Sequence, residues 1–346
     1  MITWEQANRR AGVLASELHG ELDLELDRPI DVFHAIQRLD LVLAFADLEA
    51  TSGVYLPARS GGALAGILVH QGHPLTRQRY TAAHELGHHR FNHGDEVDGD
   101  IESMRREHFD TMTDQEKEAE AFAAWFLMPR RVVRAGMKAL DLALSGPGDA
   151  YALSTWLGTS YTATVRHLPA IRMLDPAMAG QWAMLRPLDL KAELSGQIAW
   201  GNSRSDVVAL ADTHNVQTVN VRPGDRMLLQ LEEAASTGYT WAAEEMPSGV
   251  EVLADSEAGQ WTPRFLSSPG DDSRRDAQVP GIGQRRGLLI GLSEDLGSAA
   301  PTILRLGFKL ERPWSGAVTR AMEVLVAVEP RRHGLQEPED LLRLDA

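Results

Sequence analysis

The chain has 346 residues, a formal net charge of -15 and no cysteine. Its length and its 43% hydrophobic content allow two or three domains with sizeable cores, and we expect two. The lack of Cys excludes disulfides, a thiol nucleophile and a Cys-ligated zinc, and it fits a reducing cytoplasm. The acidic balance disfavours nucleic acid as a partner. No stretch approaches the ~18 apolar residues of a membrane span and the first residues lack an export signal, so we expect a cytoplasmic protein that does not bind membranes.

The first part of the chain predicts two helices and a small sheet. Residues 4–20 have the periodicity of an amphipathic helix, and a second helix is expected at 29–39, where Pro29 suits the first position. Three short apolar runs bounded by turn residues predict strands at 41–45, 53–56 and 65–69. We expect this sheet to pack against the helix that follows and to offer an edge to an extended peptide.

The next segment reads His-Glu-Leu-Gly-His at positions 84–88. Residues four apart share one helical face, so His84 and His88 can hold one zinc ion while Glu85 lies close enough to activate a metal-bound water. We expect the helix to start near Thr81, which can cap it. Gly87 costs about 1 kcal/mol relative to Ala in a helix, which makes sense where another backbone or a substrate comes near. The pattern predicts metal-assisted hydrolysis, and the alternative is a solvated helix end with coincidental histidines.

A further helix is expected from Glu116 to Pro129, with acids at its start and Pro129 as its stop. A catalytic zinc needs three protein ligands and one open position, so a glutamate from this helix would complete the set. Glu116 and Glu120 share a face, which lets Glu116 ligate while Glu120 orients a ligand histidine. Glu118 points about 160° from Glu120, so we expect it to be solvated, although all three acids remain candidates. The alternative is a charged first turn of an amphipathic helix.

Two other segments near these helices carry candidate functional groups. Residues 92–114, rich in Asp, Glu and Gly, predict a loop near the site, and His89, His93 and His108 are expected at the surface rather than in substrate binding. Residues 150–168 have the helix, Gly turn, helix rhythm of a helix-turn-helix, but its second helix carries only Arg166 and His167 as basic groups. We therefore expect a packing element that closes the first domain, and a DNA-binding regulator is the disfavoured alternative.

Residues from about 29 to 175 resemble the ImmA/IrrE-type metallopeptidases, whose signature is Arg-aromatic-Thr-x-x-His-Glu-x-x-His followed by a Glu-x-x-Ala-x-x-Phe-Ala…Leu-Met-Pro helix. The segment 79–88 and the helix 116–129 match both halves. The resemblance implies one Zn²⁺ per chain in a gluzincin-like, HExxH-bearing α+β domain, with ligands His84, His88 and Glu116 and general base Glu85. It also implies limited cleavage of a regulatory protein, such as a repressor or antitoxin of the kind that controls stress responses. One departure is Glu120, which stands where the family commonly has Asn.

Beyond Pro176 the sequence becomes mostly β. Seven candidate strands separated by Gly, Pro and Ser turns predict a sandwich: 216–221, 226–231, 239–242, 249–254, 287–292, 302–311 and 320–329. We place the first domain at 1–175, a connector at 176–211, the sandwich at 212–330 and a C-terminal tail at 331–346.

Three turn motifs occur in this half, at 236–241, 281–284 and 312–314. A Thr-Gly tip can enter a narrow cleft, and Trp314 on a rigid Arg-Pro turn can anchor a partner. The motifs make residues 212–330 similar to the chagasin-like inhibitors of papain-type cysteine proteases, which present three loops at one end of an immunoglobulin-like sandwich. The resemblance implies these partner-binding loop residues: Thr237, Gly238, Tyr239, Trp241, Gly281, Gly283, Arg312, Pro313 and Trp314. Ala234-Ala235 and Gln284 depart from its pattern. The alternative is that both tryptophans are core residues and that the glycines only make turns.

We therefore expect a multidomain protein, with an α+β zinc metallopeptidase domain followed by an all-β immunoglobulin-like sandwich. Its function would be limited proteolysis of a regulatory protein. The sandwich would recognise or restrain a partner, either a papain-like cysteine protease or the chain's own peptidase domain. The alternative is a cysteine-protease inhibitor that carries a structural metal domain, and the intact set of histidines and acids argues against it.

Overall fold

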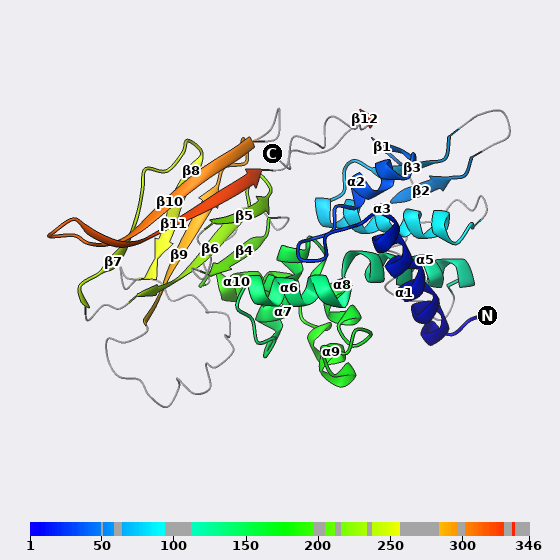
Figure 1. The fold of residues 1–346 in the computed structure, drawn as a ribbon, viewed down its shortest axis with the longest axis horizontal. Helices are drawn as coiled ribbons and strands as arrows, with labels where there is room; N and C mark the ends of the chain where they lie inside the picture. The colour runs from blue at the N-terminus through cyan, green and yellow to red at the C-terminus, as the bar shows by residue number, and fades with distance from the viewer. Residues whose placement is uncertain are drawn as a thin grey trace. The chain divides into compact units, whose positions relative to one another are not determined.

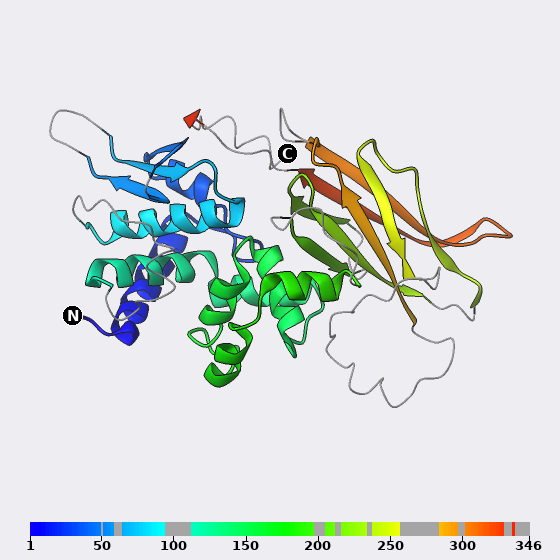
Figure 2. The same cartoon turned by 180° about the vertical axis from the view of Figure 1, so that it is seen from behind.

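The computed structural model describes residues 1–49, 51–58, 64–93, 112–196, 205–211, 216–233, 237–256, 284–296, 302–328 and 334–335. The chain forms two compact units that interleave along the sequence (Figures 1 and 2). Met1–Ala135, Leu157–Gly180 and Arg331–Ala346 make up the first unit, and Gly136–Trp156 with Gln181–Pro330 make up the second. In the described residues, no helix is both long enough and apolar enough to span a bilayer.

Side-chain caps define the start of the first two helices of the first unit. A capping box formed by Thr3 and Gln6 starts α1 (Trp4–Glu21), and the Asp31 carboxylate accepts two backbone hydrogen bonds at the start of α2 (Val32–Arg38). The first predicted helix is thereby confirmed, and the second begins three residues later than Pro29 suggested. The other helices follow: α3 (Leu75–Arg90), α5 (Asp114–Leu127), α6 (Arg130–Ala139), which runs on into the second unit, and α8 (Tyr161–His167).

The three predicted strands of the first unit are confirmed as β1 (Val42–Ala46), β2 (Gly53–Leu56) and β3 (Gly66–His70). The sheet has the order β12-β1-β3-β2, with β1 parallel to β3 and β2 antiparallel to it. The added strand β12 (Gly334–Leu335) comes from the predicted C-terminal tail and pairs antiparallel with β1. In the described part of this sheet, β2 is therefore the edge strand on the side away from β12.

The second unit contains two four-stranded sheets, ordered β5-β11-β10-β7 and β4-β6-β9-β8. Their apolar side chains form a common core that includes Trp241, Phe308 and Ile290. All seven predicted strands are confirmed: β5 (Val216–Val221), β6 (Arg226–Glu233), β7 (Thr240–Ala243), β8 (Val250–Asp255), β9 (Gln284–Leu292), β10 (Thr302–Arg312) and β11 (Ala317–Val328). The turn between β10 and β11 lies at the end of these sheets opposite to α10 (Figure 1).

The stretch 176–211, assigned above to a connector, holds regular structure. It contains α9 (Pro176–Trp182), α10 (Pro187–Leu194) and β4 (Val207–Ala211), which pairs in parallel with β6. Four of the β4 residues are buried in the described structure: Val207, Val208, Ala209 and Leu210. Pairing with β6 thus makes a strand of part of the stretch that was expected to be a connector.

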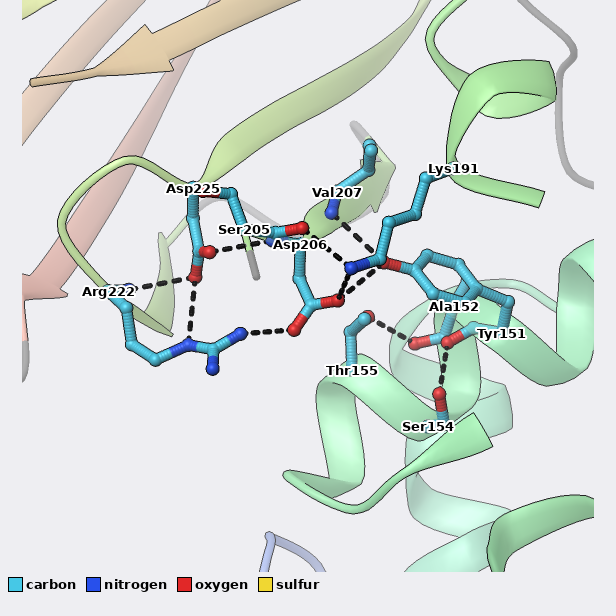
Figure 3. A network of polar contacts seen from close by, with 10 residues as sticks. All are labelled: Tyr151, Ala152, Ser154, Thr155, Lys191, Ser205, Asp206, Val207, Arg222 and Asp225. Atoms are coloured by element: carbon cyan, nitrogen blue, oxygen red, sulfur yellow. Dashed lines mark hydrogen bonds and ion pairs between the residues drawn. The ribbon is translucent and has the colours of Figure 1, made fainter. Parts of the chain in front are cut away.

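A buried polar network joins the helices of the second unit to its sheets (Figure 3). Tyr151, on α7 (Pro147–Leu157), donates a hydrogen bond of 2.9 Å to Asp206 just before β4. Lys191 on α10 forms an ion pair of 2.9 Å with the same carboxylate, and Arg222 pairs with both Asp206 and Asp225. Burial alone would raise the pKa of Asp206, but the neighbouring Arg222 and Lys191 hold it below its ordinary value. The network therefore fixes α7 and α10 to the β sheets through charges that compensate one another.

Candidate metal centre

The close approach of two helices, α3 and α5, builds the site. Thr113 caps α5 by accepting a hydrogen bond from the Glu116 backbone, which sets Glu116 in the first turn. Gly87 on α3 faces the α5 backbone, and a Cβ added there would lie 3.0 Å from Ala119 Cα. The expectation that another backbone comes near Gly87 is therefore confirmed. Thr81 does not cap α3, because the helix already begins at Leu75 and Thr81 lies buried within it.

Three donor side chains converge between these helices. The Nε2 atoms of His84 and His88 are 3.1 Å apart, and the Glu116 carboxylate oxygens lie 3.3 Å from His84 Nε2 and 3.4 Å from His88 Nε2. Zinc bonds of about 2.0–2.1 Å at tetrahedral angles place ligand atoms about 3.3 Å apart. All three residues are buried, and their ligand atoms form a group that could hold a metal ion. Two imidazoles and one carboxylate at this spacing fit zinc.

Glu85 belongs to α3, and its side chain lies next to Gly53 of the edge strand β2. Its side chain is 1% exposed, and a Cβ added to Gly53 would lie 2.9 Å from Glu85 Oε1 and would overlap Thr81 Cγ2. Glycine is thus required at position 53, a functional position that the sequence analysis did not single out. The available signal was a glycine at the start of an otherwise apolar strand, which often marks a close approach.

Glu120 lies on the far side of His84 from the donor cluster. Its Oε2 atom is 3.6 Å from His84 Nδ1, and its Oε1 atom accepts a hydrogen bond of 3.0 Å from the Tyr80 hydroxyl. A carboxylate at the second nitrogen of a ligand histidine fixes the orientation of the ring. The structure thus places the Glu116 carboxylate near the Nε2 atoms of both histidines and the Glu120 carboxylate near Nδ1 of His84.

Glu118 is buried, so the expectation that it is solvated is wrong. The reason is that α5 is covered on two sides, with α3 on one and α1 on another. Its carboxylate pairs with Arg10 of α1 and lies 3.1 Å from His93 Nε2. His93 is also buried rather than at the surface, and burial lowers its pKa, an effect partly offset by the hydrogen bond to Glu118.

The other nearby histidines have different settings. His89 is half-buried, and its Nδ1 atom lies 3.0 Å from the Tyr55 hydroxyl on β2. Burial, and secondarily the charge of Arg90, lowers the pKa of His89. His108 and most of the predicted loop 92–114 lie outside the described residues.

The helix, Gly turn, helix rhythm of 150–168 is confirmed, with Gly158 at a φ of +66° between α7 and α8. The two helices fall in different units, however, because α7 goes with the β sheets as far as Trp156. His167 is buried, and its Nε2–H donates to the Met128 carbonyl at 3.1 Å. It is therefore not available to bind DNA.

Two of the three predicted loops of the second unit contact each other. Trp314 is 73% exposed, and its indole covers Gly238, where an added Cβ would lie 2.7 Å from Trp314 Cζ2. Gly238 also has a φ of +74°, a backbone conformation that favours glycine independently of the contact with Trp314. The Arg312 guanidinium lies 4.4 Å from the centre of the Tyr239 ring, and its Nε–H donates to the Thr237 carbonyl at 3.2 Å. The aromatic and cationic groups of this surface are thus held in place by the opposite loop.

The remaining predicted loop residues divide three ways. Pro313 is exposed beside Trp314. Trp241 is 1% exposed in the common core, so its assignment to a partner-binding surface is wrong; its ring is directed inward by the β7 register. Gly281 and Gly283 lie outside the described residues.

Comparisons with known proteins address both parts of the chain. Three solved structures are similar to part of it. The cysteine protease inhibitor EhICP2 from Entamoeba histolytica is 17% identical, with a TM-score of 0.27, over 37% of this chain and all of that one. Amebosin is 19% identical, with a TM-score of 0.22, over 36% of this chain and 98% of that one. PbICP-C in complex with falcipain-2 is 17% identical, with a TM-score of 0.21, over 36% of this chain and 99% of that one. No curated protein matches the chain. The family model that describes the IrrE N-terminal-like domain of the M78 peptidases matches residues 36–141. The stretch 36–141, which carries His84, Glu85, His88 and Glu116, is thus an IrrE N-terminal-like domain of the M78 peptidase family.

Proposed function

We propose that this protein is a zinc-dependent endopeptidase that makes limited cuts in a regulatory protein of the repressor or antitoxin type. The observation that carries the proposal is the convergence of His84, His88 and Glu116 at separations of 3.1–3.4 Å, with Glu85 buried beside them. Membership of residues 36–141 in the M78 peptidase family supports the same reaction class.

Each residue of the site has a role in this chemistry. A zinc ion held by His84, His88 and Glu116 would supply a Lewis acid that polarises the scissile carbonyl and lowers the pKa of a water molecule. Glu85 takes the proton from the attacking water and passes it to the leaving amine. The edge strand β2 runs past Glu85 at Gly53, so an extended substrate segment that pairs with β2 would bring its peptide bond to the carboxylate.

The second unit favours selective over general proteolysis in this proposal. We assign to its two sheets an immunoglobulin-like arrangement, with the Gly238–Trp314 surface as the site that recognises a partner. An exposed tryptophan held against a glycine provides a rigid apolar anchor at little cost in conformational entropy.

Metal analysis and a search for new protein termini test the proposal. The full-length protein, Glu85→Gln and the exposed control Glu17→Gln are purified, assayed for zinc and incubated with a cell lysate whose new amino termini are then sequenced. We expect one zinc per chain in all three, and a small set of new termini in regulatory proteins that is absent with Glu85→Gln. Lack of stoichiometric zinc, or identical termini with Glu85→Gln and the wild type, would refute the proposal.

The exposed Trp314 favours a second candidate function, inhibition of a papain-like cysteine protease. Loss of inhibition in Trp314→Ala, with inhibition retained in the exposed neighbour Val318→Ala, would support it. Absence of inhibition by the wild-type protein at micromolar concentration would exclude it for the protease tested.

A further inference from the structure

A series of polar contacts leads away from the metal donors to α1, and its members are buried except for Arg10, whose side chain is 57% exposed. The Nδ1 atoms of His88 and His93 are 3.0 Å apart, His93 Nε2 is 3.1 Å from Glu118 Oε2, and the other Glu118 oxygen pairs with Arg10. The exposed fractions of His88, His93 and Glu118 are 5%, 8% and 5%. We propose that His93, Glu118 and Arg10 are positioning residues that orient His88 for metal binding, an inference that rests on the proposed zinc site.

One assignment of donors and acceptors satisfies the hydrogen bonds between His88, His93 and Glu118. Glu118 is a carboxylate paired with a cation, so it accepts, and His93 donates to it from Nε2–H. The His93 Nδ1 atom is then the acceptor, and His88 donates to it from Nδ1–H. This leaves the lone pair of His88 Nε2 directed at His84 and Glu116, where a metal ligand is required. These hydrogen bonds thus select the tautomer of His88 that can bind a metal.

Arg10 extends the site beyond the IrrE N-terminal-like domain, because α1 precedes residue 36. Its guanidinium carbon lies 5.7 Å from the centre of the Phe91 ring, and Phe91 in turn stacks on His93 with an interplanar angle of 8°. Phe91 therefore contacts both Arg10 and His93. A buried carboxylate is costly without a cation, so the ion pair with Arg10 stabilises the Glu118 carboxylate next to His93.

Metal affinity tests the inference directly. The full-length proteins are titrated with Co²⁺ and Zn²⁺ in competition with a chromophoric chelator, and the visible spectrum of bound Co²⁺ reports the ligand geometry. We expect about 10–100-fold weaker zinc binding and an altered Co²⁺ spectrum in His93→Phe, and about 10-fold weaker binding in Arg10→Ala. Arg10→Lys should restore most of the affinity. The matched control is Arg9→Ala, because Arg9 is a neighbour on α1 that is exposed and pairs only with the exposed Glu5 among the described contacts.

The outcomes separate this inference from the proposed function. Wild-type protein that binds neither metal would refute the zinc site itself. Wild-type binding that is matched in affinity and spectrum by His93→Phe and Arg10→Ala would overturn only the positioning chain. Weaker binding accompanied by loss of the helical circular dichroism of the metal-free variants, or shared by Arg9→Ala, would also overturn it, because the effect would then arise from folding or from surface charge.

Discussion

Replacement of Gly87 by alanine is expected to weaken the metal centre without touching a metal donor. The added Cβ would lie 3.0 Å from Ala119 Cα, 3.2 Å from the Ala119 carbonyl oxygen and 3.2 Å from Phe122 Cβ. Two of these atoms belong to the α5 backbone, which cannot rotate away as a side chain can. The helices must therefore separate by a few tenths of an ångström, and Glu116, one turn earlier on α5, moves with them.

Two opposing energies decide the size of the effect. Alanine is a better helix former than glycine by about 1 kcal/mol, whereas overpacking a tight contact costs about 1–3 kcal/mol. We expect overpacking to prevail in Gly87→Ala, with a net loss of about 1 kcal/mol in the free energy of unfolding of the metal-free protein. Zinc binding should fall about 10-fold, so the stabilisation gained from zinc should fall by a further ~1.4 kcal/mol.

Urea unfolding with and without zinc measures both quantities. The matched control is Gly20→Ala, in the last turns of α1, where an added Cβ has no neighbour within 4 Å. This control should gain up to about 1 kcal/mol from helix propensity and keep its response to zinc. If Gly87→Ala gained the same stability as Gly20→Ala and responded equally to zinc, the close approach of α3 and α5 would not govern the site.

Three further substitutions test other parts of the structure. Gly53→Ala should lower the rate of cleavage about 10–100-fold but keep one zinc per chain, because the added methyl would displace Glu85; loss of zinc would contradict this. Burial lowers the pKa of His167 from 6.5 to about 4. As the pH falls, the unfolded state therefore binds a proton at this histidine before the folded state does. The free energy of unfolding should fall by about 3 kcal/mol between pH 7 and pH 4 for this reason. His167→Gln should abolish that part of the loss in thermal or urea unfolding, and an unchanged pH profile would count against it. Asp206→Asn should destabilise the second unit by about 3 kcal/mol, because Lys191 stays buried without its carboxylate; a change below 1 kcal/mol would show that the network is not needed.

The parts of the fold with strong local signals could be predicted from the sequence. The α5 periodicity is visible in the chain, the seven strands are apolar runs between turn residues, and the spacing of His84 and His88 defines a shared helical face. These features depend on residues close together in the sequence, so no tertiary information is needed. For the third donor the sequence favoured Glu116 but left Glu118 and Glu120 as candidates, because the helical spacing alone does not show which acid reaches the histidines; the structure groups Glu116 with them.

The misjudged residues depend on contacts between distant segments. A helical wheel gives the direction of Glu118 relative to Glu120, but it cannot show that α1 covers that direction with Arg10. Likewise, β4 becomes a strand because β6 pairs with it, and Trp241 lies in a loop-like motif whose next residues continue into the core. Each error assigned to solvent a side or segment that another part of the chain covers.

The segments of the two units alternate along the sequence, so neither unit can be obtained by a single cut in the chain. The chain leaves one unit for the other after Ala135, Trp156, Gly180 and Pro330. A fragment that stops at residue 175 retains every metal donor but carries α7 without the Asp206 that its Tyr151 binds, and a fragment that starts at 212 lacks β4. A cut at either residue therefore divides a segment from the unit that it packs into, and each unit is built from parts of the chain on both sides of the cut at 175.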